Sequence, residues 1–295
     1  MRTRALGPLQ VSVVGLGCNN FGRRIDEDAT RAVVDAALDA DVTFFDTADI
    51  YGDGLSETFL GRALEGRRDR VVLATKFGGR GDIAHGRGSR DAVRRALHAS
   101  LERLQTDRLD LYQHHQEDPE TPLEETIGVL DELVGEGKIR AYGTSNYTAR
   151  RIEQAAALAR EAYVSEQSEY SWLMRDAERD LLPTCERLGL GFIPYFPLAS
   201  GLLTGKYRRD EAAPEGTRLH GREISDARWD RLDTIEAFAR ERGVSLLEVA
   251  IGGLAAQPAV ASVIAGATKP EQVRANAAAG EWEPSPDDGA KLRAL

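Results

Sequence analysis

Residues 42–51 read Val-Thr-Phe-Phe-Asp-Thr-Ala-Asp-Ile-Tyr, an apolar run that ends in an acid and, five residues later, a phenol. The runs at 71–75 and 109–113 end in the same way, directly before Lys76 and before the pair His114-His115. Short apolar runs are typical of buried parallel strands, and in parallel β/α proteins catalytic groups gather where the strands end. The sequence therefore predicts that Asp46, Tyr51, Lys76 and His115 meet at one rim and form a proton-transfer site.

Strand-like runs alternate with amphipathic helical segments along the whole chain. Eight such runs are found, at residues 11–17, 42–46, 71–76, 109–115, 139–144, 163–167, 191–195 and 261–265. The alternation predicts an α/β fold, a single (β/α)8 TIM barrel in which residues 1–295 form one domain. A doubly wound open sheet is the alternative, because periodicity does not show whether a sheet closes.

Local signals add detail at the ends of several elements. Residues 3–6 and 9–11 flank Gly7-Pro8 and predict a short N-terminal β-hairpin that plugs the amino-terminal mouth of the barrel. Thr121-Pro122-Leu123-Glu124 predicts a capping box with proline at the first helical position. Two long connections, 78–88 and 196–225, are expected at the carboxyl-terminal face, and loops of this length without apolar periodicity are either functional or disordered.

Composition narrows the class of protein. The 295 residues are 42% hydrophobic and carry a net charge of −10 without a basic stripe, which disfavours nucleic acid and anionic membrane as partners. The two cysteines, Cys18 and Cys185, predict neither a disulfide framework nor a metal site. Without a signal-peptide core or a long apolar segment, a cytoplasmic location is expected. The oligomeric state is not encoded in any pattern that we can identify.

The four rim groups suit the reduction of a carbonyl group. The oxygen of a reduced carbonyl needs a proton, and Tyr51 can act as the general acid. An ammonium at Lys76 would lower the tyrosine pKa, Asp46 would hold Lys76, and His115 would orient the carbonyl. Strand alternation places residues 111, 113 and 115 on one face and so favours His115 over His114. Each residue could instead have a purely structural role: Asp46 as a turn cap, Tyr51 as a loop residue, Lys76 as a surface lysine and His115 as a buried histidine.

Several motifs together resemble the aldo-keto reductase superfamily over essentially the whole chain. They are Phe45-Asp46-Thr47-Ala48-Asp49-Ile50-Tyr51-Gly52, Lys76-Phe77-Gly78, Asp110-Leu111-Tyr112-Gln113-His114-His115, the segment 137–146 and the segment 195–207. The resemblance implies a catalytic tetrad of Asp46, Tyr51, Lys76 and His115, with Tyr51 as acid/base. It also implies an NADPH cofactor, with NADH as an open alternative, and no metal.

The resemblance also implies which residues hold the cofactor. Ser145, Asn146 and Gln167 would bind the carboxamide, Tyr195 would stack on the nicotinamide ring, and the adenosine segment would lie near the last strand. The complete set is Ser145, Asn146, Gln167, Tyr195, Pro197, Leu198, Ser200, Gly201, Lys206, Gly266, Ala267, Thr268, Lys269, Gln272 and Asn276. Gln272 departs from the family pattern, because many members carry there a basic residue that binds the adenosine 2′-phosphate.

Three functions remain open. The first is reduction of a small-molecule aldehyde or ketone, the second a nicotinamide-binding regulatory subunit that senses redox state, and the third an aldolase or lyase that uses Lys76 as a Schiff-base amine. Lys76 paired with Asp46 would stay protonated, which disfavours the third. Substrate specificity is expected in residues 78–88, Gln116-Glu117, Trp172 and 207–225, and the arginines of the last segment allow an anionic or sugar-like carbonyl.

Overall fold

A computed structural model describes residues 1–79 and 87–295 of the chain. Eight parallel strands form one sheet in the order β10-β3-β4-β5-β6-β7-β8-β9. They are β3 (Val14–Gly17), β4 (Phe44–Asp46), β5 (Val72–Phe77), β6 (Leu109–His114), β7 (Ile139–Ser145), β8 (Tyr163–Glu169), β9 (Gly191–Tyr195) and β10 (Val263–Gly266). The predicted residues 80–86 of the loop after β5 lie outside the described residues.

The sheet curls into a nearly closed barrel, which confirms the predicted (β/α)8 fold. Strands β9 and β10 share no continuous ladder, but a parallel bridge joins Phe192 at β9 to Val260, three residues before β10. Two backbone hydrogen bonds accompany it, from Phe192 to Ala259 at 2.7 Å and from Ala261 to Phe192 at 2.9 Å. The bridge excludes the open sheet, because it connects the two edge strands.

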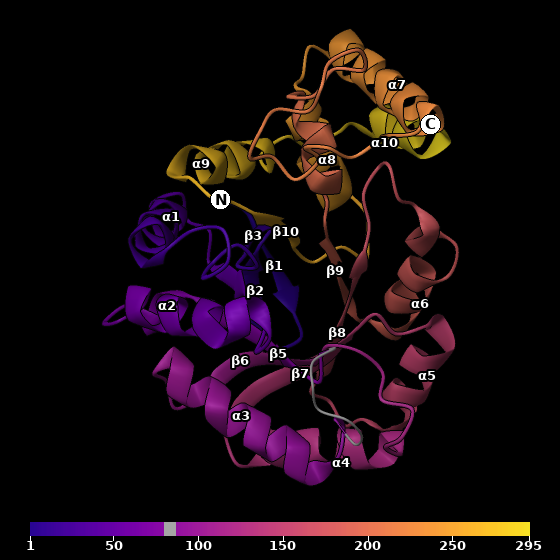
Figure 1. Ribbon diagram of the computed structural model, residues 1–295. Coiled ribbons are helices and arrows are strands. Elements are labelled where there is room, and N and C mark those ends of the chain that lie inside the picture. Colours follow the sequence, from indigo (N-terminus) through magenta and orange to yellow (C-terminus); the bar gives the residue numbers. More distant parts are fainter. Residues whose placement is uncertain (80–86) are drawn as a thin grey trace.

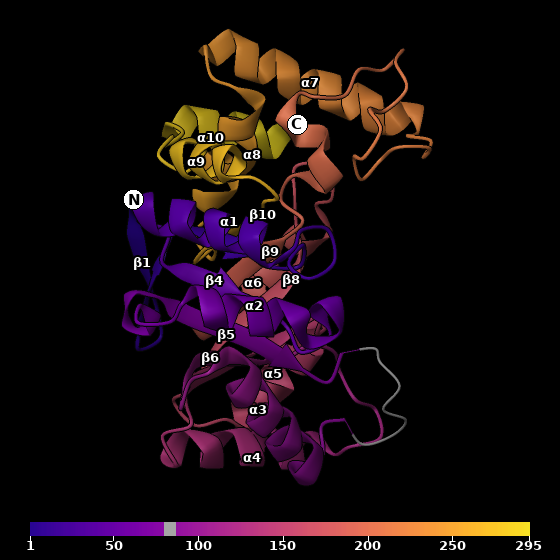
Figure 2. The ribbon, with the colours of Figure 1, turned by 60° about the vertical axis from the view of Figure 1, so that its left-hand side comes forward.

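Helices surround the barrel (Figure 1). They are α1 (Glu27–Asp39), α2 (Leu55–Ala63), α3 (Arg90–Leu104), α4 (Leu123–Gly135), α5 (Ala149–Leu158), α6 (Leu181–Leu188), α7 (Asp226–Arg242), α8 (Leu246–Ala255), α9 (Pro270–Ala279) and α10 (Pro286–Ala294). Figures 1 and 2 show α7, α8 and α10 grouped at the far side of the molecule from α3 and α4. Within the described ranges, no helix combines the length and apolar character that a membrane span requires.

Strand alternation divides the core into two parts. Phe45, Leu73 and Tyr112 belong to a large cluster between the strands and the helices. Phe44, Ala74 and Leu111, one residue away in each strand, belong to a separate cluster inside the barrel. The even positions of β4 and β5 and the odd positions of β6 from Leu111 onward therefore face the barrel axis, where the predicted site residues also lie.

The predicted N-terminal hairpin is present, with β1 (Thr3–Leu6) antiparallel to β2 (Leu9–Ser12). Leu6, Leu9 and Val11 belong to the interior cluster, so the hairpin fills one end of the barrel, as predicted (Figure 2). The prediction that the first barrel strand begins at Val11 is wrong, because Val11 pairs with Arg4 in the hairpin and the barrel strand begins at Val14.

The predicted capping box of α4 is also wrong. Pro122 is itself the N-cap residue and its helix begins at Leu123. The Thr121 hydroxyl donates to the Asp118 carboxylate at 2.7 Å, because the carboxylate also accepts from the Gly88 and Glu120 amides and organises this loop. The apolar face predicted for the helix is nevertheless correct, since Leu123, Ile127 and Leu130 are buried.

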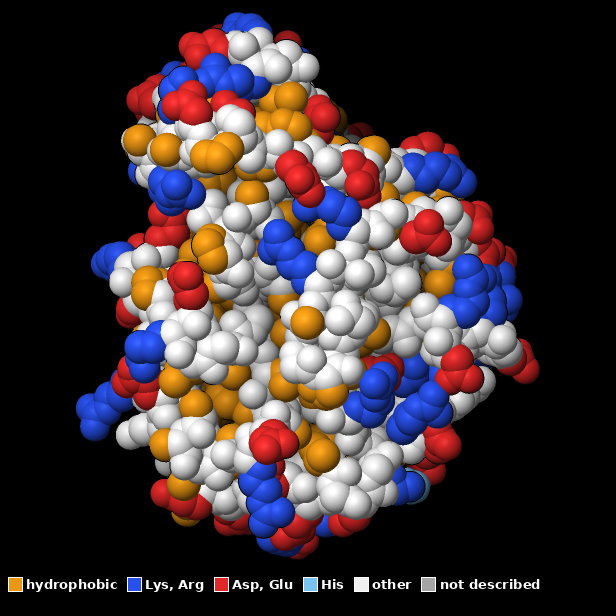
Figure 3. Space-filling view, turned by 180° about the vertical axis from the view of Figure 1, so that it is seen from behind, with side chains coloured by type: hydrophobic (Ala, Val, Ile, Leu, Met, Phe, Trp, Pro, Cys, Tyr) orange, Lys and Arg blue, Asp and Glu red, His pale blue; other side chains and the backbone are white. Residues whose placement is uncertain are grey.

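Charges are mixed on the surface opposite the view of Figure 1. Figure 3 shows Lys and Arg side chains interspersed with Asp and Glu on that face rather than gathered in a stripe. Both cysteines are buried and unpaired. The described residues contain no cluster of three or more His, Cys, Asp or Glu side chains suited to a metal ion.

Candidate active site

Asp46 and Lys76 form an ion pair at the carboxyl ends of β4 and β5. The Lys76 ammonium donates to the Asp46 carboxylate at 2.5 Å and to the Thr47 carbonyl at 2.9 Å. Both side chains are buried, with exposed fractions of 0% for Lys76 and 2% for Asp46. Burial acts to lower the pKa of Lys76, but the negative charge of Asp46 and the proximity of Tyr51 raise it above its ordinary value. Lys76 is therefore a protonated amine beneath the cavity floor, which disfavours the Schiff-base function.

The second oxygen of Asp46 accepts two side-chain amides. Gln167 donates at 2.9 Å and Gln113 at 3.1 Å. Gln113 was missed as a site residue, although the alternation that selects His115 places it on the same interior face. These bonds fix the carboxylate, and thereby fix the ammonium that it holds.

Tyr51 begins a short 3-10 helix, η1 (Tyr51–Gly54), after the turn that follows β4. Gly52 and Gly54 have φ of 58° and 88°, conformations that glycine adopts at little cost, and they turn the chain so that the phenol enters the cavity. The Lys76 ammonium lies 5.3 Å from the centre of the Tyr51 ring. The predicted juxtaposition of phenol and cation is therefore present.

The predicted net lowering of the Tyr51 pKa is not found. Burial raises the pKa of Tyr51 above its ordinary value, and the charge of Lys76 offsets only part of this increase. The reason is that the protein surrounds the phenol closely, and a phenolate loses more hydration than one neighbouring cation restores. Tyr51 consequently carries its proton throughout the neutral range.

His115 lies beside Tyr51, with the two rings at 84° and their centres 6.0 Å apart. Burial, followed by the charges of Lys76 and His114, lowers the pKa of His115 to about 3. The imidazole is thus neutral at any working pH. His114 is on the other face, where it stacks on Phe77 at 4.8 Å and bonds to the Tyr147 hydroxyl at 2.7 Å. The alternation argument therefore identified the histidine that lines the cavity.

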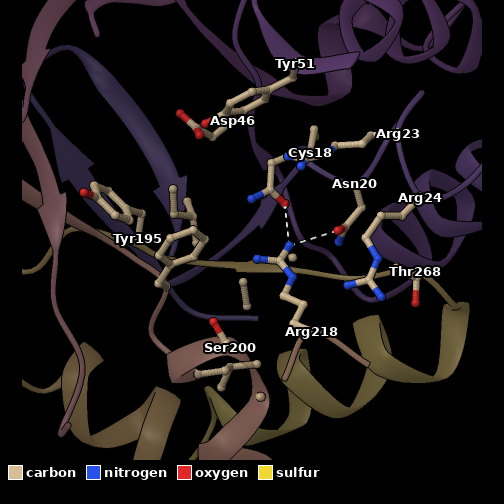
Figure 4. Close-up of a pocket in the computed structure, with 18 of the residues that line it drawn as sticks. Cys18, Asn20, Arg23, Arg24, Asp46, Tyr51, Tyr195, Ser200, Arg218 and Thr268 are labelled. Atoms are coloured by element: carbon tan, nitrogen blue, oxygen red, sulfur yellow. Dashed lines mark hydrogen bonds between the residues drawn. The ribbon is translucent and has the colours of Figure 1, made fainter. Parts of the chain in front are cut away.

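Above this floor lies a cavity of about 1250 Å³. Asp46, Tyr51 and His115 line it, as does every predicted cofactor residue except Ala267. Ala267 is buried, and its carbonyl accepts from the Asn20 amide at 3.1 Å. The structure thus brings residues from the carboxyl ends of seven strands, and from segments more than 200 positions apart, into one cavity (Figure 4).

Ser145, Asn146 and Tyr195 are already linked by hydrogen bonds. Asn146, with φ of 60°, donates to the His115 carbonyl at 3.1 Å and to the Ser145 hydroxyl at 3.0 Å. The Tyr195 hydroxyl donates to the Asn146 amide oxygen at 2.8 Å. These polar side chains are held at one wall, next to the catalytic candidates.

The backbone after β9 is shaped for close approach of a ligand. The segment η4 (Ala199–Thr204) contains Ala199, Ser200 and Gly201 at positive φ. Gly201 has φ of 95°, a conformation that favours glycine because other residues adopt it only with strain. Lys206 itself lies over the Tyr207 ring and lines the cavity. The segment fits a polyanionic dinucleotide, because Pro197, Leu198, Ser200 and Gly201 line the cavity together with the cation of Lys206.

Several residues that line the cavity, among them Asn20, Arg23 and Arg24, were not predicted, whereas Arg218 lies in the predicted specificity segment 207–225. Arg218 donates to the amide oxygens of Asn19 at 3.1 Å and Asn20 at 2.9 Å and lies over the Phe196 ring. Segment 215–218 therefore crosses the cavity from the β9 side to the β3 side. No local sequence signal links residues 19 and 218, since the contact depends on how the barrel closes.

Several of the predicted specificity positions do not line the cavity, Trp172 and Arg209 among them. Trp172 is 2% exposed, and its indole donates to the Val249 carbonyl at 2.8 Å, so it packs under α8 rather than against a ligand. Arg209 pairs with Asp226, Asp230 and Asp233. Gln116 and Arg218, in contrast, line the cavity.

Comparison with known proteins supports this assignment. The model of the Aldo/keto reductase family matches residues 13–295. An uncharacterized oxidoreductase, YrpG of Bacillus subtilis (strain 168), is 38% identical over 90% of this chain and 86% of its own length. A probable voltage-gated potassium channel subunit beta of Oryza sativa subsp. japonica is 35% identical over 91% of this chain and 87% of its own.

Solved structures of aldo/keto reductases are also similar to this chain in both sequence and fold. The holo form of the aldo-keto reductase AKR11C1 from Bacillus halodurans is 34% identical, with a TM-score of 0.85, and the match covers 100% of this chain and 96% of that one. An aldo/keto reductase from Klebsiella pneumoniae in complex with NADP and acetate is 32% identical, with a TM-score of 0.79 over 99% and 94%. The predicted resemblance is confirmed, and the chain belongs to the aldo/keto reductase family of NAD(P)H-dependent oxidoreductases.

Proposed function

We propose that residues 1–295 form a single-domain carbonyl reductase that uses NADPH to reduce an aldehyde or ketone to an alcohol. The observation that carries this proposal is the buried Lys76–Asp46 pair directly against Tyr51 at the floor of the cavity. The cofactor, when bound, supplies the hydride to the carbonyl carbon. The Klebsiella pneumoniae relative is described in complex with NADP, which supports the choice of nucleotide.

The four rim residues divide the proton chemistry among them. Tyr51 is protonated at neutral pH and donates its hydroxyl proton to the oxygen as negative charge develops there. The Lys76 ammonium stabilises the phenolate that remains, at a distance at which burial strengthens the attraction. Asp46 keeps the ammonium in place, and neutral His115 donates a hydrogen bond that orients the carbonyl.

Cofactor contacts follow from the cavity walls. Ser145, Asn146 and Gln167 present polar groups to a carboxamide, and Tyr195 offers its ring to the nicotinamide. The η4 segment and Lys206 suit the pyrophosphate, while residues 266–276 suit the adenosine. This order places the reactive ring next to Tyr51 and the adenosine at the opposite end.

The Tyr51→Phe variant tests the role of the phenol. It keeps the ring, so binding of NADPH should be unchanged, whereas the rate of carbonyl reduction should fall by about 10²–10⁴. Tyr112→Phe is a matched control, because it removes a hydroxyl from a buried tyrosine that faces away from the barrel axis. Retention of full activity in Tyr51→Phe, measured by nicotinamide absorbance, would remove Tyr51 from its proposed role.

A regulatory function is the second candidate. Relatives in Oryza sativa and Arabidopsis thaliana are described as probable voltage-gated potassium channel subunits beta. Stoichiometric binding of NADPH without oxidation across a broad panel of aldehydes and ketones would favour this function. The complete set of acid, cation and imidazole beside the cavity favours turnover.

A further inference from the structure

The cavity carries an excess of cations in a chain of net charge −10. Its cationic side chains are Arg23, Arg24, Lys206, Arg218 and Lys269, and its carboxylates besides the lysine-paired Asp46 are Asp53 and Glu215. None of these five cations forms an ion pair with a carboxylate in the parts of the chain that the structure describes. Unpaired cations around one cavity indicate an anionic ligand with several charges.

The start of α9 supplies no cation at position 272. The Gln272 amide oxygen accepts from the Thr268 backbone N–H at 2.8 Å and from the Thr268 hydroxyl at 3.2 Å. The Gln272 side chain is thereby turned back toward Thr268, the residue before the N-cap of α9. A dianionic phosphate at this end of the cavity therefore needs a second cation beside Lys269, supplied by another segment of the chain.

Arg24 comes to this end from the loop between β3 and α1. The Asn20 amide ties that loop to the Ala267 carbonyl at 3.1 Å, and the Arg24 backbone N–H donates to the Asn20 carbonyl at 2.8 Å. Figure 4 shows Arg24 and Thr268 at one side of the cavity and Asp46 and Tyr195 at the other. Arg24 therefore lies at the end far from the proposed chemistry.

One hydrogen bond orients the Arg24 guanidinium and leaves other N–H donors available for a ligand. One of its terminal nitrogens donates to the Gly216 carbonyl at 2.6 Å, in the segment that crosses the cavity. A guanidinium has five N–H donors, and a planar pair of them matches two phosphate oxygens. The charges of Arg23 and Arg24, after burial, lower the pKa of Arg218, so positive charge is concentrated here before a ligand arrives.

We propose that Arg24 is the residue that selects NADPH over NADH, by binding the adenosine 2′-phosphate together with Lys269. The inference rests on the proposed function, because it takes the cofactor to be a dinucleotide with its nicotinamide at Tyr51. The 2′-phosphate is the one group that distinguishes the two nucleotides. Arg24 supplies from the β3–α1 loop the charge that Gln272 does not.

Binding of NADPH and NADH to the intact protein tests the proposal without relying on turnover. In Arg24→Gln the dissociation constant of NADPH should rise about ten-fold to a hundred-fold, the range expected for losing hydrogen bonds to a charged group. The constant for NADH should change by less than about two-fold. Arg24→Lys should recover part of the NADPH affinity. Arg31→Gln, which removes one exposed charge from neighbouring α1 outside the cavity, is the matched control and should change neither.

Every other outcome overturns the assignment. If Arg24→Gln weakens both nucleotides equally, Arg24 acts through the Gly216 contact and does not read the phosphate. If it weakens neither, or if the unaltered protein binds both with equal affinity, Arg24 confers no selectivity. If the unaltered protein binds no nicotinamide nucleotide at all, the proposed function fails as well, which distinguishes that failure from the others.

Discussion

Removal of the Lys76 ammonium should destabilise the fold, and the structure indicates by how much. Lys76→Met leaves Asp46 as a buried carboxylate without its 2.5 Å partner. Breaking a buried pair from one side typically costs ~3–5 kcal/mol. At about 2–4 °C per kcal/mol for chains of 150–250 residues, the melting temperature should fall by roughly 6–20 °C.

The double variant Asp46→Asn/Lys76→Met separates this cost from lost packing. An asparagine at position 46 still offers an oxygen to the amides of Gln113 and Gln167. Without a buried charge, the double variant should be more stable than Lys76→Met alone. The deficit of Lys76→Met should also be smaller at pH 5 than at pH 8, because an unpaired buried carboxylate gains from taking up a proton.

Urea unfolding followed by circular dichroism at both pH values measures these differences. The two single variants and the double variant form a thermodynamic cycle with the unaltered protein. Our reasoning would be refuted if Lys76→Met were as stable as the double variant, since the ion pair would then contribute no coupling energy.

Three further predictions concern the site and its support. Because the pKa of His115 is lowered to about 3, the pH profile of carbonyl reduction should show no inflection near 6.5, and the appearance of one in the unaltered protein but not in His115→Gln would contradict the neutral imidazole. Burial, followed by the charge of Glu57, raises the pKa of Asp49 to about 7, so the folded state holds this proton more tightly than the unfolded chain and loses stability as pH rises from about 4 through 7. Asp49→Asn should therefore raise the melting temperature more at pH 8 than at pH 5. An equal increase at both pH values would contradict this reasoning. Gly61→Ala should unfold at a markedly lower urea concentration, because its Cβ would lie 2.7 Å from the backbone at the end of α3, whereas Gly128→Ala, with open space around it in α4, should be neutral or stabilising by up to about 1 kcal/mol.

Strand periodicity accounts for what could be predicted about the site. A residue's parity along a strand decides which face of the sheet it occupies, and this local rule selected His115, which lines the cavity, over His114. Asp46 and Lys76 were selected because each ends an apolar run, and in the structure they form a buried ion pair. The same rule places Gln113 on the interior face. We did not select Gln113, because an uncharged amide does not by itself indicate a catalytic function. Motif resemblance added the cofactor walls, and nearly all of those residues line the cavity.

The amino-acid sequence by itself determined the order of strands and helices, the faces of the strands and the groups at their carboxyl ends, because these depend on neighbours a few residues away. Only the tertiary structure decided the closure of the barrel at Phe192, the exclusion of Trp172 from the cavity, and the meeting of Arg24 and Arg218 at the loop after β3. It also decided the sign of the Tyr51 pKa shift. Each of these depends on burial or on contacts between distant segments, which arise from the packing of the whole chain and leave no periodic trace along it.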